Sequence, residues 1–182
     1  MDDIKILKLY AKNRRMPEAV KFGTVSNDWL NYAKNFAESL PATSDAALEQ
    51  RVTMNVKGTE IEAYDSLTEF YNQKYFDQID LPEIFSQLEG VHHLRFGVLQ
   101  AASTIPFHLD EPYSLRFICM ISGSHKYHVE TGSSYVMEQG DLWFINGSYK
   151  HSVENNLQYD RIALLGKFAN SEKNIRLINE LL

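Results

Sequence analysis

Residues 92–168 constrain the fold most, because short segments with alternating polar and apolar residues fill this stretch. Turn-forming residues separate the segments at Gly123, Gly132, Gly140 and the Asn146–Gly147 pair. Alternation with a period of two places every second side chain on the same face of a strand. Short strands separated by turns are typical of β-barrels and β-sandwiches. The pattern therefore predicts a β-rich core in residues 91–169.

Helical patterns surround this core. Ser26 is a predicted N-cap for a helix whose apolar residues recur at helical spacing from Trp29 to Leu40 and stop before Pro41. Residues 66–76 and 81–88 are further predicted helices, and a hairpin is expected around Lys57–Gly58. We expect one domain, in which residues 1–90 form a helical region buttressing the core and residues 170–182 form a C-terminal helix beginning at Asn170 or Ser171.

Composition narrows the class of protein. The chain has 182 residues and a single cysteine, Cys119, which stands in an apolar run and is expected to be buried. One cysteine permits no intramolecular disulfide, the N-terminus lacks the apolar core of a signal peptide, and no run is long enough to cross a bilayer. We therefore expect a cytoplasmic protein without a membrane partner. A net charge of −6 without a Lys/Arg cluster argues against nucleic acid.

His108, Asp110 and His151 are the candidate metal ligands. On one strand, His108 and Asp110 would point the same way, roughly 6 to 7 Å apart. A second strand over residues 149–154, returning beside the first, would present His151. Two imidazoles and a carboxylate form the facial triad that binds Fe(II) and leaves its opposite face open. A His-X-Asp sequence also arises often by chance, and Asp110 could instead begin a turn with Glu111 and Pro112.

Arg161 lies in a predicted strand over residues 159–165, whose apolar run would place the guanidinium inside the barrel. A buried guanidinium needs an anion, and its planar fork suits a carboxylate. The alternative is a surface arginine paired with Asp160 or Glu154. The remaining histidines are not predicted to be ligands, because neighbours one or three apart on a strand face opposite sides: His92, His93, His125 and His128.

Residues 94–168 resemble a known family. The resemblance is carried by IPFHLD at 105–110, Arg116, MEQGDLW at 137–143, HSVEN at 151–155 and DRI at 160–162. Together these segments are similar to the aspartyl/asparaginyl β-hydroxylase family, which includes proline 3-hydroxylase-like enzymes. The resemblance implies an α+β, mainly β fold: the double-stranded β-helix (jelly-roll, cupin-like) barrel of Fe(II)/2-oxoglutarate oxygenases.

The resemblance also implies a chemistry. His108, Asp110 and His151 would bind Fe(II), and Arg161 would pair with the distal carboxylate of 2-oxoglutarate. Arg116 falls near an arginine that contacts the co-substrate or the substrate in the family. The expected activity is a dioxygenase that uses O2, converts 2-oxoglutarate to succinate and CO2, and hydroxylates an unactivated C–H bond. Because Asp110 is retained where related halogenases have a small residue, hydroxylation is favoured over halogenation.

The expected substrate is a small amino-acid-like molecule or an amino-acid residue in a peptide. Such a substrate needs a cationic partner for its carboxylate and an anionic partner for its ammonium group. The sequence offers four candidates for the first role, Arg116, Arg95, Lys126 and Lys150, and two for the second, Glu130 and Glu138.

A cupin is the alternative reading. Gly140, His151 and Asn155 have the spacing of the second cupin motif, but the first cupin motif needs His-X-His where this chain has His-Leu-Asp. A cupin would be a 2-oxoglutarate-independent dioxygenase, an isomerase or a metabolite-binding module. It gives no reason for Arg161 ten residues after His151, so this arginine discriminates between the readings. A noncatalytic barrel that has lost its metal is disfavoured because all three candidate ligands are present.

Overall fold

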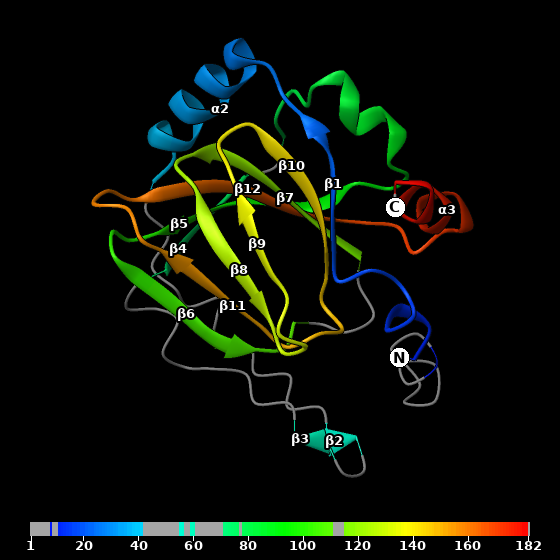
Figure 1. The fold of residues 1–182 in the computed structure, drawn as a ribbon. Helices are drawn as coiled ribbons and strands as arrows, with labels where there is room; N and C mark the ends of the chain where they lie inside the picture. The colour runs from blue at the N-terminus through cyan, green and yellow to red at the C-terminus, as the bar shows by residue number, and fades with distance from the viewer. Residues whose placement is uncertain are drawn as a thin grey trace.

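Two antiparallel β-sheets face one another in this protein (Figure 1). The computed structural model describes residues 8, 11–41, 55–56, 59–60, 71–76, 78–110 and 115–181. The strands are β1 Ala19–Thr24, β2 Asn55–Val56, β3 Thr59–Glu60, β4 Tyr71–Tyr75, β5 His92–Leu99, β6 Ser103–His108, β7 Leu115–Ser122, β8 His125–Val129, β9 Ser134–Met137, β10 Asp141–Asn146, β11 His151–Asn155 and β12 Arg161–Phe168. The helices are α2 Asn27–Ser39, the 3-10 helix η2 Glu83–Gln87 and α3 Glu172–Glu180.

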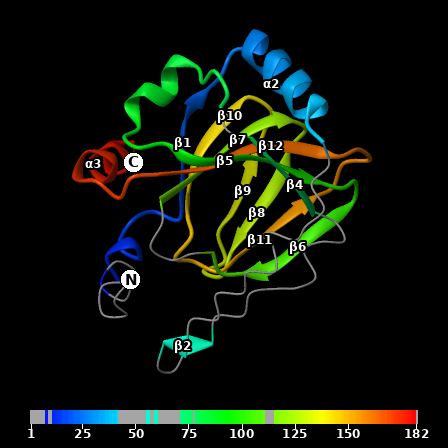
Figure 2. The ribbon, with the colours of Figure 1, turned by 180° about the vertical axis from the view of Figure 1, so that it is seen from behind.

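The larger sheet has the strand order β1-β10-β7-β12-β5-β4, and the smaller has the order β6-β11-β8-β9. From β5 to β12 the chain passes back and forth between the two sheets, which is the double-stranded β-helix connection of a jelly roll (Figure 2). In the described part of the chain these strands form two separate sheets rather than one closed ring, and β2 and β3 form a third, two-stranded sheet. The predicted mainly β, jelly-roll fold is confirmed.

Each face of the larger sheet has its own apolar core. In β7, Phe117, Cys119 and Ile121 point outward and pack with residues of α2, η2 and α3. The intervening Ile118 and Met120 point inward and pack against the smaller sheet. This alternation is the physical basis of the two layers, because a strand buried on both faces carries an almost continuous apolar run. Cys119 is fully buried, as expected.

The predicted helix starts agree with the structure. Ser26 Oγ accepts a hydrogen bond from Trp29 N at 3.3 Å, and Ser171 Oγ accepts one from Asn174 N at 3.2 Å. Both caps satisfy an amide that the first helical turn leaves without an internal partner. In Figure 1, α2 lies above the sheets and α3 beside them. No helix in the described ranges is long and apolar enough to cross a membrane.

The region before residue 90 is less helical than the sequence pattern predicts. The hairpin is present as β2 and β3, and residues 81–88 contain the short η2 rather than a full α-helix. The helix expected over residues 66–76 is wrong where the chain is described, because Tyr71–Tyr75 is β4 and pairs antiparallel with β5; residues 66–70 lie outside the described residues. β1, which the sequence reading missed, pairs with β10. β1 and β4 form the two edges of the larger sheet.

Asn155, which the cupin comparison singled out, holds the corner between β11 and β12. Its Nδ2 donates to the carbonyl oxygens of Leu99, Gln100 and Tyr159 at 3.1, 2.9 and 3.0 Å, and its Oδ1 accepts from Leu157 N at 3.1 Å. The side chain is fully buried. One amide therefore contacts four backbone groups, two at the end of β5 and two in the turn that leads from β11 to β12.

Replacing Asn155 by alanine should lower the free energy of unfolding by about 2 to 4 kcal/mol, because buried backbone groups would lose their partner. Urea denaturation of wild type and Asn155→Ala measures this loss. The exposed neighbour Asn156→Ala is the matched control and should change stability little. Equal stability of Asn155→Ala and wild type would contradict the role of Asn155 in the corner.

Candidate metal centre and adjoining pocket

Antiparallel pairing of β6 and β11 brings two of the candidate ligands together. His108 is the last residue of β6 and lies opposite His151, the first residue of β11. Asp110 lies two residues beyond the end of β6, so the chain after the strand, and not strand alternation, places its carboxylate. The alternative turn of Asp110 with Glu111 and Pro112 lies outside the described residues. The ligand atoms of His108, Asp110 and His151 all lie within 4.8 Å of one another.

Both imidazoles present the same nitrogen to Asp110. His108 Nε2 lies 3.9 Å from Asp110 Oδ1, and His151 Nε2 lies 3.6 Å from Asp110 Oδ2. The two rings are in contact, with centroids 4.3 Å apart. Arg116 Nη1 also lies 2.9 Å from Asp110 Oδ2 and forms an ion pair with it. The structure thus places Arg116 directly beside the carboxylate of the triad.

The other nitrogen of each imidazole is held by a backbone carbonyl. His108 Nδ1 lies 2.8 Å from Pro106 O, and His151 Nδ1 lies 3.0 Å from Tyr149 O. A carbonyl oxygen only accepts hydrogen bonds, so Nδ1 of each ring carries a proton, and Nε2 is the nitrogen through which each ring could bind a metal. Such carbonyl partners are the usual means by which proteins orient metal-binding histidines.

The charges of the triad also suit a divalent metal. Burial opposes ionisation of Asp110, but the positive charge of Arg116 and the neighbouring His151 and His108 hold the pKa of this carboxyl well below its usual value. Burial, together with the charge of His108, lowers the pKa of His151 to about 4. At neutral pH the site therefore offers a carboxylate and a neutral imidazole from a buried histidine. These donors fit Fe(II), which accepts two imidazoles and one carboxylate.

Arg161 begins β12 and is buried between the sheets, with 2% of its surface exposed. On the same face of β12, Ala163 and Leu165 pack in the inner core. Arg161 Nη1 donates to Gly97 O at 3.4 Å. The expectation that its guanidinium lies inside the fold agrees with this burial, and the alternative of a surface arginine is wrong.

His125 and Tyr127 join Arg161 in the interior, and the sequence reading missed both as pocket residues. Among the described residues, His125 Nδ1 and Tyr127 Oη are buried without a hydrogen-bond partner. The ring of Tyr127 stacks on that of His151, with centroids 4.8 Å apart. His125 Nε2 lies 3.2 Å from Met137 Sδ. The sequence does contain a signal for both residues. His125, Tyr127 and Val129 alternate along one strand, and the apolar Val129 indicates that this face of the strand points inward.

Both of these residues are neutral. Burial, with a further contribution from the positive charge of Arg161, lowers the pKa of His125 well below its usual value. Burial, reinforced by the negative charge of Asp110, raises the pKa of Tyr127 well above its usual value. The interior beside the triad thus combines one cation with two neutral hydrogen-bonding groups.

The other candidates from the sequence fall into two sets. Arg95 shares the inner face of β5 with Leu99, and its charge contributes to the low pKa of Asp110. The rest are exposed: Lys126, Lys150, Glu130 and Glu138. Among the described residues, His108, Asp110 and His151 form the only group of three or more close enough to hold a metal. His92, His93, His125 and His128 do not belong to it.

A family model described as aspartyl/asparaginyl β-hydroxylase matches residues 62–170 of the sequence. The chain belongs to this family. The matched range contains every residue of the metal centre and the adjoining pocket, including the three candidate ligands and Arg161. The match therefore supports a hydroxylase. No curated protein sequence matched the chain.

One solved structure supports the same fold for this β-hydroxylase family member over nearly its whole length, and two others resemble part of the chain. An oxidoreductase of the 2OG-Fe(II) oxygenase family from Burkholderia pseudomallei superimposes with a TM-score of 0.56 at 11% identity, covering 91% of this chain and 90% of that one. A predicted oxalate decarboxylase from Thermotoga maritima gives a TM-score of 0.41 at 17% identity, covering 54% of this chain and 79% of its own. The Cnp3 cupin domain of Schizosaccharomyces pombe gives a TM-score of 0.42 at 10% identity, covering 57% of this chain and 69% of its own.

The low pKa of His151 predicts a loss of stability in acid. Between its ordinary value of 6.5 and its folded value of about 4, the unfolded chain binds the proton more readily, so acidification favours unfolding. In the metal-free protein, kept so by a chelator, protonation of His151 should lower the free energy of unfolding by about 2 kcal/mol at pH 5 relative to pH 7. Urea denaturation at both pH values measures the effect. His151→Gln should show a pH dependence smaller by that amount, and identical dependences would contradict the assignment.

Proposed function

We propose that the protein is an Fe(II)/2-oxoglutarate-dependent dioxygenase that hydroxylates an amino acid or an amino-acid residue. The observation that carries this proposal is the pairing of a metal triad with a buried arginine. His108, Asp110 and His151 offer three ligand atoms within 4.8 Å, and Arg161 lies in the interior beside them. Besides burial, the charges of Arg161 and His151 both lower the pKa of His125, so Arg161 acts electrostatically on the interior next to the triad.

The triad would bind Fe(II) through His108 Nε2, His151 Nε2 and the carboxylate of Asp110. Three protein ligands leave the opposite face of an octahedral ion available to other ligands. When bound, the iron supplies the activation of O2 that hydroxylation of a C–H bond requires. Asp110 contributes the negative charge that the two neutral imidazoles lack. Pro106 O and Tyr149 O orient the rings.

The pocket between the sheets would bind 2-oxoglutarate. Arg161 provides a cation and a planar donor fork for the distal carboxylate. His125 Nδ1 and Tyr127 Oη provide two further polar atoms that would otherwise stay buried without a partner, which is unfavourable by about 1 to 3 kcal/mol each. A carboxylate accepts hydrogen bonds from several donors at once, so one anion could satisfy this pocket.

The substrate would approach from the side of Arg116 and Arg95. Both side chains lie on the inner face of the larger sheet, and both act electrostatically on Asp110. They are the candidates retained for a substrate carboxylate, whereas Lys126 and Lys150 are exposed elsewhere. The cupin reading gives no role to a buried Arg161 beside the triad, so the pocket favours the oxygenase.

His108→Ala or His151→Ala should abolish turnover and weaken Fe(II) binding strongly, because only two of the three protein ligands would remain to hold the ion. Isothermal titration under nitrogen measures the metal affinity, and circular dichroism checks that the fold survives. His128→Ala, a histidine outside the triad, is the matched control and should bind Fe(II) as wild type does. Wild-type affinity in either triad variant would remove that residue from the site.

Arg161→Ala should weaken 2-oxoglutarate binding on the order of 30-fold to several thousand-fold, which corresponds to about 2 to 5 kcal/mol for an anion that loses its buried partner. Tyr127→Phe removes a single hydroxyl and should weaken binding about two- to tenfold. Arg161→Lys should recover part of the loss, because an ammonium keeps the charge without the fork.

The test titrates 2-oxoglutarate into the anaerobic Fe(II) form of each variant and follows succinate formation with a panel of amino acids. Iron affinity of Arg161→Ala should stay close to that of wild type. If Arg161→Ala bound 2-oxoglutarate as tightly as wild type, the arginine would be structural and the cupin reading would gain ground.

A further inference from the structure

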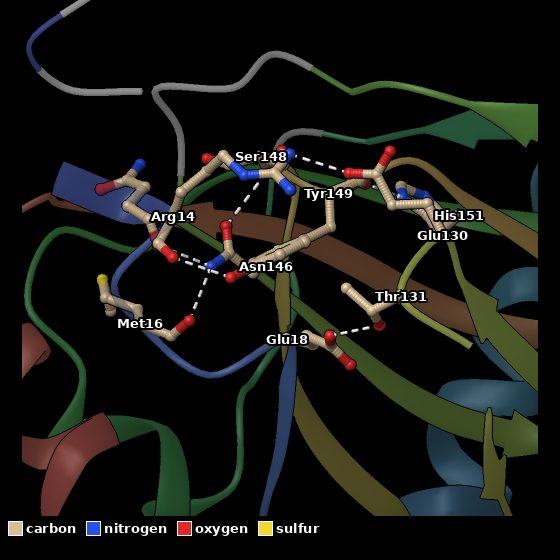
Figure 3. A network of polar contacts seen from close by, with 10 residues as sticks. Arg14, Met16, Glu18, Glu130, Thr131, Asn146, Ser148, Tyr149 and His151 are labelled. Atoms are coloured by element: carbon tan, nitrogen blue, oxygen red, sulfur yellow. Dashed lines mark hydrogen bonds and ion pairs between the residues drawn. The ribbon is translucent and has the colours of Figure 1, made fainter. Parts of the chain in front are cut away.

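A segment near the N-terminus, Asn13–Glu18, contacts both the β10–β11 turn and the β8–β9 turn. We call this segment the strap. Asn146 Nδ2 donates to Asn13 O at 2.8 Å and to Pro17 O at 3.2 Å, and Asn146 N donates to Glu18 O at 2.9 Å. These bonds tie the strap to the end of β10, just before the turn that leads to His151 (Figure 3).

Arg14 of the strap contacts two residues of that turn, Ser148 and Tyr149, and also Glu130 of the β8–β9 turn. Its guanidinium carbon lies 4.4 Å from the centroid of the Tyr149 ring, and its Nη1 donates to Ser148 O at 3.1 Å and to Glu130 Oε1 at 2.8 Å. In return, Tyr149 Oη donates to Arg14 O at 2.7 Å. Figure 3 shows Arg14 and Tyr149 side by side, with His151 just beyond. Tyr149 is therefore held at its ring, its hydroxyl and the preceding carbonyl.

The residue held in this way supplies the carbonyl that orients His151. Tyr149 O accepts the hydrogen bond from His151 Nδ1 at 3.0 Å, which leaves Nε2 facing Asp110. His108 differs, because its acceptor Pro106 O belongs to β6 itself. The acceptor that orients His108 thus belongs to the same strand as His108. The acceptor that orients His151 belongs to a residue held by a segment more than 130 positions away in sequence.

We propose that the strap positions His151 for metal binding, with Arg14 and Tyr149 as positioning residues. The inference rests on the metal centre of the proposed function. Loss of a residue that orients a metal-binding histidine typically lowers metal affinity 10- to 100-fold, because the imidazole is no longer held in one orientation. No residue of the strap belongs to the candidate metal-ligand group, so the strap would act on His151 through Tyr149.

Metal affinity separates this role from a general effect on stability. Co(II) titration, followed by its visible absorption, should give an affinity about tenfold or more weaker for Tyr149→Phe and Arg14→Met than for wild type. Arg15→Met removes a charge from an exposed side chain of the same segment and should leave the affinity unchanged. Thr131→Val is the second control, because Thr131 Oγ1 donates to Glu18 and ties the strap to the β8–β9 turn, which carries no ligand. It should lower the apo-protein melting temperature but not the affinity.

A second readout compares the two histidines within one molecule. In the Co(II) protein, the Nδ1 protons of both ligands give exchangeable, paramagnetically shifted NMR signals. In Tyr149→Phe, the His151 proton should exchange with solvent several-fold faster while the His108 proton keeps its wild-type rate. Should Arg14→Met fail to fold, Tyr149→Phe, which lacks only a hydroxyl, still decides the question.

These experiments distinguish failure of the positioning role of the strap from failure of the proposed metal centre. If wild type does not bind Co(II), the metal centre itself is wrong. If wild type binds Co(II) and both strap variants bind it equally well, with melting temperatures lowered as in Thr131→Val, the strap is structural only and the inference is overturned. Equal acceleration of both histidine protons would overturn it as well.

Discussion

Antiparallel pairing of β6 with β11 is the interaction on which the site depends. It sets His108 opposite His151 at the point where one strand ends and the other begins. The jelly-roll connection makes this pairing possible, because it brings strands far apart in the chain into neighbouring positions of one sheet. Since side chains alternate along a strand, a slip of one residue between β6 and β11 would turn a ligand away from the interior and dismantle the triad.

The inner face of the fold combines an apolar core with a small polar region. Leu99, Met120 and Val153 fill the space between the sheets, while Arg161 and Asp110 carry charge there. Charge in such a place is stabilised only by partners of opposite charge or by hydrogen bonds. Arg116 forms such an ion pair with Asp110. We propose that the distal carboxylate of 2-oxoglutarate becomes an additional partner of Arg161, so that the polar part of the interior serves co-substrate binding.

Local patterns in the sequence predicted the features that local physics determines. Capping by Ser26 and Ser171 and the alternation of β7 follow from residue type and spacing. Pairing over long distances was harder to predict. β4 lies in a segment with helical spacing and is a strand because it pairs with β5. β1 is likewise a strand because it pairs with β10. His125 was considered only as a possible metal ligand and Tyr127 was not considered, because the burial of both in the interior that also holds Arg161 depends on long-range pairing.

The central claim is that the triad holds Fe(II) with an open face next to a pocket for 2-oxoglutarate. Visible absorption of the anaerobic protein tests it most directly, because 2-oxoglutarate that chelates such an iron through its carboxylate and keto oxygens produces a weak charge-transfer band at about 500 nm. The account predicts that this band appears when Fe(II) and 2-oxoglutarate are both present and is absent with succinate. A protein that binds Fe(II) but develops no band with 2-oxoglutarate would contradict the account and favour a cupin.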